Sequence, residues 1–422
     1  MSAERKNLFV GLAKRSTGEA TYMVRQLAAL PPDFRVSLLV NRALAGVVGG
    51  YGGDKAFHEL TGMPFGEILR SLESVFRDCA NVTLIDLNCF FLECNIRPEQ
   101  RRELFALLER THSGGVTVSV VDYFGSCTLT EAEHASRLSA AQARLERKIR
   151  GIPTTSRLGY YLRKFIPERM EMQLIPPFAG PVILRPVPIN RGQAATDREL
   201  GYLNLLDVVP RARERKHRRT VFFGLSRFFE YTVEHPIISN LCAGIFLELK
   251  KVLDIDRIVC IDPFSCVSGI ELPDGLELET HAWLESGELD RILDESLFAG
   301  LFVPYGTVGT IALNRGVPFV SFGASESSMT SDAFRALMKG QAFPGFHALG
   351  IWEDNPYFRA VSSVDICDSE SFARLAEDLE SGAADRRVRA YQDWLASLDV
   401  LPFSSCLDRL YARSAACAGE VR

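Results

Sequence analysis

The segment 289–322 constrains the fold of this 422-residue chain more than any other. Leucine and isoleucine residues at helical spacing over 289–293 predict a short amphipathic helix. An apolar run over 297–303 follows, and then glycine and threonine residues at 306–310 form a turn that opens a second helix. Residues 317–322 are typical of a buried parallel strand. The segment therefore predicts an α/β unit in which a loop of small residues follows a strand.

The glycine and threonine residues of this turn have the composition of an anion site. Open α/β sheets bind their ligands beyond the carboxyl ends of the strands. Gly306 and Gly309 let a bound group approach the backbone, while Thr307 and Thr310 offer hydroxyl groups. Because the free N–H groups of a new helix favour negative charge, we expect a phosphate group there.

Five pieces of this region follow one another in an order that resembles a known superfamily. They are Trp-Leu at 283–284, the helix at 289–293, Gly-Thr-x-Gly-Thr at 306–310, Ala-Leu at 312–313 and Gly-Val-Pro at 316–318. This order is similar to the donor-binding half of the GT-B-fold glycosyltransferases. In addition, Ser16 to Tyr22 and the 301–323 block resemble a bacterial family of glycosyltransferase-like proteins.

The resemblance implies a fold and a donor site. The fold is α/β and GT-B-like, with two doubly wound Rossmann-like domains facing a central cleft. The 306–310 turn would hold a nucleotide diphosphate, and Trp283 would contact its base. One position departs from the pattern, because Ile311 stands where the superfamily usually has a glutamate that binds the ribose hydroxyls.

Length and composition favour a cytoplasmic two-domain protein. A chain of 422 residues is too long for one typical core, and a net charge of −5 argues against a general nucleic-acid binder. The ten cysteines are scattered without a Cys-x-x-Cys pair, which favours buried thiols in a reducing compartment. The sequence shows no signal-peptide core and no apolar run long enough to span a membrane.

The pattern of elements divides the chain into four parts. We predict an acceptor-side Rossmann-like domain over 1–200, a basic linker over 201–219, a nucleotide-sugar domain over 220–385 and a helical segment over 386–422 that packs back on the first domain. In the first domain we expect strands at 7–12, 35–40, 81–86 and 116–122, helices at 20–30, 65–76, 98–110 and within 130–170, and a glycine-rich loop over 41–65. In the second domain we expect strands at 220–224, 257–261 and 276–278, and helices at 239–252, 330–338 and 369–379.

Glu19 is the first choice for a catalytic base. The loop Ser16-Thr17-Gly18-Glu19 follows the first strand, and its Ser-x-Gly-Glu pattern resembles that of Kdo transferases, which are GT-B enzymes whose glutamate acts as base. Thr17 and Gly18 then belong to the substrate site. An inverting transfer needs such a base within reach of the acceptor hydroxyl. The alternative is an acid that is favoured in the first turn of a helix by the helix dipole.

Other candidate residues lie at loops after strands. Asp86 and Asp122 end two expected strands and are interpreted as a base, as acceptor ligands or as turn-forming residues. The remaining candidates are His58 in the glycine-rich loop, Ser226 and Arg227 facing the phosphates, and Glu326 facing the donor sugar.

We predict no metal site and no cofactor beyond a nucleotide sugar as co-substrate, because histidine and cysteine residues are not clustered at ligand spacing. The leading hypothesis is an inverting, metal-independent glycosyltransferase acting on a small-molecule, peptide or glycan acceptor. A sugar-nucleotide epimerase or hydrolase is a second hypothesis. A GT-B-like protein without turnover, acting as a binding or scaffold protein, is a third, favoured by Ile311.

Overall fold

The computed structural model describes residues 5–11, 34–39, 55–58, 60, 62–77, 79–86, 94, 96–121, 182–186, 202–204, 219–225, 235–262, 265–302, 306–323 and 356–420. These residues fall into two compact units. The first unit contains the described residues up to 204 together with 399–420, and the second contains those from 219 to 398.

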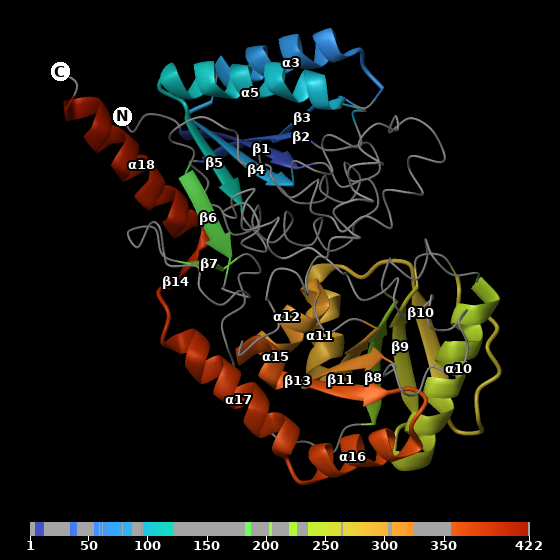
Figure 1. The fold of residues 1–422 in the computed structure, drawn as a ribbon. Helices are drawn as coiled ribbons and strands as arrows, with labels where there is room; N and C mark the ends of the chain where they lie inside the picture. Colours follow the sequence, from blue (N-terminus) through green and yellow to red (C-terminus); the bar gives the residue numbers. More distant parts are fainter. Residues whose placement is uncertain are drawn as a thin grey trace, which may run out of the picture. The chain divides into compact units, whose positions relative to one another are not determined.

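The described strands of the first unit form one parallel sheet. Their order across the sheet is β14-β7-β6-β5-β4-β1-β2-β3 (Figure 1). The chain therefore runs outward from β1 in one direction as far as β3 and then returns to the other side of β1 with β4. The strands are β1 (Arg5–Gly11), β2 (Phe34–Leu39), β3 (Lys55–His58), β4 (Asn81–Asp86), β5 (Thr117–Val121), β6 (Val182–Pro186), β7 (Tyr202–Asn204) and β14 (Val400–Pro402).

Two amphipathic helices of the first unit, α3 (Phe65–Arg77) and α5 (Pro98–Ser113), pack on the sheet (Figure 1). Their apolar residues recur at helical spacing and bury against the inward residues of β4 and β5. A proline in the first turn of α5 fits a position where no N–H is needed. The buried residues of this core include Ile68, Leu72, Phe76, Leu104, Leu108, Val82, Leu84 and Val118.

The predicted glycine-rich loop over 41–65 is wrong in its second half. Residues Lys55–His58 form β3, which pairs in parallel with β2 and aligns His58 with Leu39. Only four residues make this strand, and they follow five glycines in the sequence, so the local pattern favours a loop. Pairing with β2 supplies the backbone hydrogen bonds that the local sequence does not predict.

The second unit contains a parallel sheet whose described strands lie in the order β10-β9-β8-β11-β12-β13. Strands with buried runs, such as VFFG in β8, occupy its middle, and the polar strand ELETH forms its β10 edge. The strands are β8 (Thr220–Gly224), β9 (Arg257–Ile261), β10 (Glu277–His281), β11 (Ser296–Leu301), β12 (Phe319–Gly323) and β13 (Val361–Asp365).

Helices cover both faces of this sheet (Figure 1). Helices α10 (His235–Val252) and α16 (Ser369–Glu380) share one apolar core with alternate residues of the strands, among them Phe223 and Ile258. On the other face, α12 (Thr307–Asn314) packs on Phe319. The remaining helices of the second unit are α11 (Ser286–Glu295), α15 (Pro356–Ala360) and α17 (Ala383–Ala396).

The α/β fold class is confirmed, and the segment 289–322 folds as the sequence predicts. Its elements are α11, β11, α12 and β12 in that order, and β12 is buried between β11 and β13. The expected helices at 20–30, within 130–170 and at 330–338 lie outside the described residues.

The carboxyl-terminal segment is divided between the units. Helix α17 belongs to the second unit, whereas β14 and α18 (Phe403–Glu420) belong to the first. Strand β14 pairs in parallel with β7, aligning Val400 with Tyr202. The sequence pattern predicts only helix here, because a three-residue strand is too short to show a period.

Candidate functional site

In the second sheet the strand order reverses between β8 and β11, which are parallel neighbours. From β8 the chain continues to β9 on one side, and from β11 it continues to β12 on the other. Doubly wound sheets bind ligands in the crevice outside the carboxyl ends of the strands at such a switch point. The residues at this place are Gly224, which ends β8, Leu225, which follows it, and the 306–310 turn after β11.

The amino end of α12 lies at this switch point and is built from small residues. Gly306 precedes the helix with φ 151° and ψ 162°, and a Cβ there would lie 3.1 Å from Leu301 Cδ1. Thr307 and Val308 are partly exposed. The first N–H groups of a helix have no partner within it, so they are available to an anion at this end.

Two residues of the turn have structural contacts that the sequence does not predict. Thr310 Oγ1 donates a hydrogen bond to the Gly306 carbonyl at 3.2 Å, which ties the hydroxyl to its own helix. A Cβ at Gly309 would lie 2.5 Å from Phe319 Cε1, so glycine is needed for the close packing of α12 on β12. The ligand roles predicted for Gly309 and Thr310 stay predictions, and both residues have a packing or helix role in addition.

Ile311 belongs to the apolar interior of the second unit. Its side chain is fully buried on α12, next to the buried Ala312 and Leu313. The position where the GT-B superfamily usually carries the ribose-binding acid is therefore part of the core in this chain.

The carboxyl end of α12 is held by polar side chains from two other helices. Arg315 follows the helix and is 8% exposed. Its Nη1 atom lies 3.1 Å from Oδ2 of Asp290 in α11. Its Nε donates to Asp294 Oδ1 at 2.8 Å, and its Nη2 donates to the second oxygen of the same carboxylate. Gln392 Nε2 of α17 donates to the carbonyls of Leu313 and Asn314, both at 3.0 Å. Burial opposes the charge of Arg315, but the two carboxylates raise its pKa further above the ordinary value.

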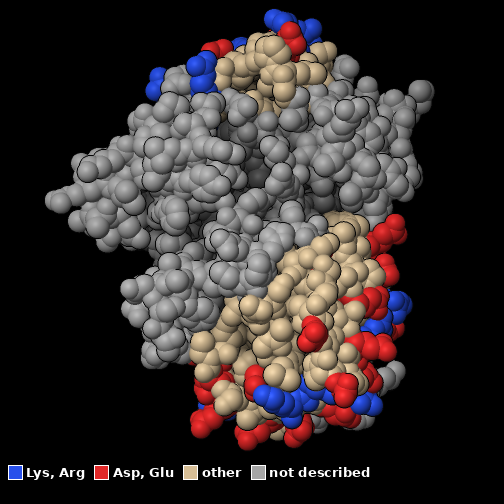
Figure 2. All heavy atoms as spheres, turned by 90° about the vertical axis from the view of Figure 1, so that its right-hand side faces the viewer, with Lys and Arg blue, Asp and Glu red and all other residues tan. Residues whose placement is uncertain are grey.

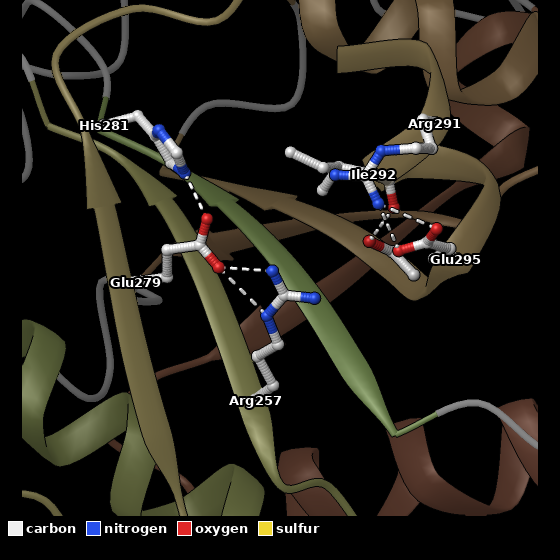
Figure 3. Close-up of polar contacts among 7 residues, drawn as sticks. Arg257, Glu279, His281, Arg291, Ile292 and Glu295 are labelled. Atoms are coloured by element: carbon white, nitrogen blue, oxygen red, sulfur yellow. Dashed lines mark hydrogen bonds and ion pairs between the residues drawn. The ribbon is translucent and has the colours of Figure 1, made fainter. Parts of the chain in front are cut away.

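A second polar group lies at the β10 edge of the sheet (Figure 3). Arg257 Nε donates to Glu279 Oε2 at 3.1 Å, and His281 Nε2 lies 2.6 Å from Glu279 Oε1. The hydrogen bond from Arg257 is the largest cause of a lowered pKa of the Glu279 carboxyl, and His281 acts in the same direction. His281 ends β10, and the partly exposed Trp283 follows in the connection to α11.

Sequence reasoning did not single out Arg257, Glu279, Arg315 or Gln392. An available signal was the alternation Glu-Leu-Glu-Thr-His in an edge strand, which places two acids and a histidine on one face. The long-range partners Asp294 and Arg315 are 21 residues apart and show no local pattern.

The sheet of the first unit has its own switch point, between β1 and β4. Gly11, the last residue of β1, is aligned with Asp86, the last residue of β4. The structure thus brings the backbone of Asp86 next to Gly11, after which the chain continues to Thr17, Gly18 and Glu19, and these three residues lie outside the described part.

The other predicted residues of the first unit are placed only in part. His58 ends β3, two strands from β1, or about 10 Å across the sheet. Asp122 directly follows β5 and lies outside the described residues, as do Ser226, Arg227 and Glu326.

The described residues contain neither a metal-binding cluster nor a membrane-spanning helix. Within them, no group of three or more His, Cys, Asp or Glu residues is arranged to hold a metal ion. One Asp-x-Asp sequence, Asp254-Ile255-Asp256, precedes β9 at the amino edge of the sheet, and both of its carboxylates pair with Arg219 at 2.9 and 3.3 Å. No described helix is both long and apolar enough for a membrane span.

Charged side chains of the second unit are mixed in sign on the face shown in Figure 2. Asp and Glu side chains lie among Lys and Arg side chains there. Surface ion pairs of the unit include Lys251 with Glu248 at 2.6 Å.

Comparisons with known proteins give matches among solved structures. No protein-family model and no curated protein matches the sequence. The glycotransferase of kitacinnamycin has a TM-score of 0.53 at 14% identity, over 98% of this chain and all of that one. The rhamnosyltransferase SpnG of spinosyn has a TM-score of 0.52 at 13% identity, over 97% of this chain and all of that one. The spinosyn forosaminyltransferase SpnP has a TM-score of 0.51 at 13% identity, over 98% of this chain and all of that one. This chain therefore has the GT-B-like fold of these glycosyltransferases.

Proposed function

We propose that this protein is a glycosyltransferase that moves a sugar from a nucleotide-activated donor to an acceptor hydroxyl with inversion and without a metal ion. The observation that carries the proposal is the amino end of α12. This end lies at the switch point of the second sheet and is built from small residues. The opposite, carboxyl end of α12 is held by hydrogen bonds from Gln392.

The donor diphosphate binds at this helix end. The first N–H groups of α12 and the Thr307 hydroxyl donate to phosphate oxygens, and the helix dipole favours the negative charge. Ser226 and Arg227 follow β8 in the sequence, on the other side of the switch point, and add a hydroxyl and a guanidinium. Trp283 offers a flat apolar surface to the base.

The acceptor binds at the first unit. Glu19 accepts the proton of the acceptor hydroxyl, and that oxygen attacks the anomeric carbon of the sugar. As the new carbon–oxygen bond forms, the bond from the anomeric carbon to the diphosphate breaks, and the diphosphate leaves with the electron pair. The donors at α12 stabilise this departing charge, in place of a metal ion. Asp86 and Asp122 orient the acceptor, together with Thr17, Gly18 and His58, and Glu326 contacts the sugar.

The buried Ile311 favours a second candidate, a GT-B-like binding protein without turnover. An isoleucine in the core supplies no acceptor for ribose hydroxyls, so the second unit would bind a diphosphate without a carboxylate contact to the ribose. An epimerase or hydrolase would use the same diphosphate contacts without an acceptor.

Ligand-induced stabilisation tests the donor site. The full-length protein is heated with nucleoside monophosphates, diphosphates and their sugars, first with EDTA and then with magnesium. A ligand that binds only the folded state stabilises it by ~2.7 kcal/mol at a hundredfold excess over its Kd. We expect one diphosphate class to raise the Tm in EDTA, and we expect Thr307→Val to reduce the shift.

Thr220→Val is the matched control, because Thr220 is the first residue of β8 and therefore lies at the amino ends of the strands, away from the proposed site at their carboxyl ends. A Tm that no nucleotide changes at millimolar concentration would contradict the donor site. Product formation then separates the candidates: a transferase needs an acceptor, an epimerase or hydrolase does not, and a binding protein forms no product. Glu19→Gln is expected to retain the Tm shift and to lose transfer.

A further inference from the structure

A continuous chain of polar contacts leads along one face of β9 and β10 to the carboxyl edge of the second sheet. The parallel register aligns Arg257 with Glu277, so Arg257, Glu279 and His281 lie on the same face. Arg257 contacts one oxygen of Glu279, and His281 contacts the other at 2.6 Å (Figure 3). All three side chains are partly buried, with exposed fractions of 24–39%.

The contacts among Arg257, Glu279 and His281 determine which nitrogen of the His281 ring carries the proton. Glu279 receives hydrogen bonds on both oxygens, and the guanidinium of Arg257 keeps it ionised, so it acts only as an acceptor. Nε2 of His281 must therefore be the N–H donor. In the neutral imidazole the second nitrogen, Nδ1, then carries a lone pair and accepts hydrogen bonds. Figure 3 shows this second nitrogen pointing away from Glu279.

His281 occupies a place that a ligand bound at α12 can reach. It ends β10 at the same sheet edge where α12 begins after β11. Three strand spacings separate β10 from β11, about 14 Å in all. Trp283, two residues further on, is partly exposed and offers an aromatic face on which a planar ring stacks.

We infer that His281 selects the base of the donor, by accepting the ring N–H of a uracil or thymine through Nδ1 while Trp283 packs on the ring. The inference rests on the proposed donor site and adds the base class to it. Uracil and thymine carry a hydrogen on N3, whereas N3 of cytosine and N1 of adenine are acceptors. Because two facing acceptors leave both unpaired, a site of this kind rejects cytidine and adenosine diphosphates.

Calorimetric titration of the full-length protein with UDP, dTDP, CDP, ADP and inorganic pyrophosphate tests this role. We expect UDP and dTDP to bind at least tenfold more tightly than CDP and ADP. His281→Phe should remove that preference and leave the affinity for pyrophosphate unchanged. His281→Asn, which places an amide oxygen near the position of Nδ1, should retain part of the preference.

Glu279→Gln gives a sharper test, since its amide can donate to Nε2 and move the ring proton to Nδ1. We expect its preference to shift toward CDP. Glu295→Gln is the matched control, because it makes the same change in an exposed ion pair within α11, where Arg291 Nη1 lies 2.8 Å from Glu295, and it should keep the preference of the unaltered protein.

The outcomes separate the two proposals. If all four nucleotides bind equally and Thr307→Val weakens them all, the diphosphate site stands and the role of His281 is wrong. If His281→Phe lowers pyrophosphate affinity as much as UDP affinity, His281 acts on the anion or on folding, and base selection is again wrong. If neither pyrophosphate nor any nucleotide binds, the proposed donor site fails, and the inference fails with it.

Discussion

The two ends of α12 are built in opposite ways. The amino end has glycine and threonine residues, with backbone N–H groups as its main polar groups. The carboxyl end is buried and carries an arginine paired with two aspartates and a glutamine that donates to two carbonyls. In the proposed function the amino end admits a ligand, and such an end cannot be fixed by bulky side chains. The helix is therefore oriented from its other end, and stability and binding should be separable along its length.

The largest expected effect is the loss of the ion pairs at the carboxyl end. Arg315→Met removes a guanidinium that is 8% exposed from two carboxylates that are partly exposed. We expect a loss of about 3 kcal/mol in the free energy of unfolding, at the lower limit for a broken buried pair. Urea unfolding measures it. Arg291→Met, which breaks the exposed pair with Glu295, should cost only about 0.5 kcal/mol, and equal losses would show that the anchor is unimportant.

The packing of α12 on β12 should give the next largest effect. Gly309→Ala places a methyl group 2.5 Å from the Phe319 ring, and we expect a loss of about 2 kcal/mol from overpacking. In the control Gly244→Ala, on the exposed side of α10, nothing lies within 4 Å of the new Cβ, so a gain of about 0.5 kcal/mol is expected. Thermal unfolding of both variants measures the difference. A Gly309→Ala protein as stable as the Gly244→Ala protein would exclude the packing role.

At the amino end of α12, substitutions of two threonines should affect ligand binding and the free energy of unfolding separately. Thr310→Val removes the hydrogen bond to the Gly306 carbonyl and should cost about 0.5–1 kcal/mol of stability. Thr307→Val should change stability by less than about 0.5 kcal/mol and weaken pyrophosphate binding about tenfold. Urea unfolding and calorimetry on the same samples test this. The separation fails if both variants lose stability and binding to the same extent.

The smallest expected effect is a dependence of stability on pH at the β10 edge. Arg257 and His281 lower the pKa of the folded Glu279 carboxyl, so the unfolded chain takes up its proton at a higher pH. The stabilisation is fully present above the unfolded pKa of about 4.3 and is lost as the pH falls through the folded value. Because the pair is partly exposed, we expect it to contribute 0.2–1 kcal/mol.

Unfolding of the unaltered protein and Glu279→Gln at pH 6, 5, 4 and 3 checks this dependence. The difference in the free energy of unfolding between the two proteins should shrink below about pH 4. A constant difference would show that the carboxylate charge contributes nothing.

How much was predictable depends on the range of the interactions. The order α11, β11, α12, β12 follows from elements of 5 to 10 residues whose apolar spacing is clear in the sequence. The same spacing predicts the longer helices α3, α5 and α16. Strands β3 and β14 have four and three residues, and they form because β2 and β7 offer them hydrogen-bonding partners. The pairs Arg315–Asp294 and Arg257–Glu279 join residues 21 and 22 positions apart, for which a single sequence carries no periodic signal.

The sequence by itself determined the α/β class of this protein, the glycine and threonine turn and its place after a strand, because those depend on local spacing and on backbone freedom. Only the tertiary structure decided that β8 and β11 are neighbours and that Gly309 faces an aromatic ring. The same holds for Ile311, which is buried in the core, and for His281, whose ring is held by Glu279. The physical reason is that neighbours in a sheet, burial and the proton on an imidazole are set by groups far away in the chain, which meet only when the core packs.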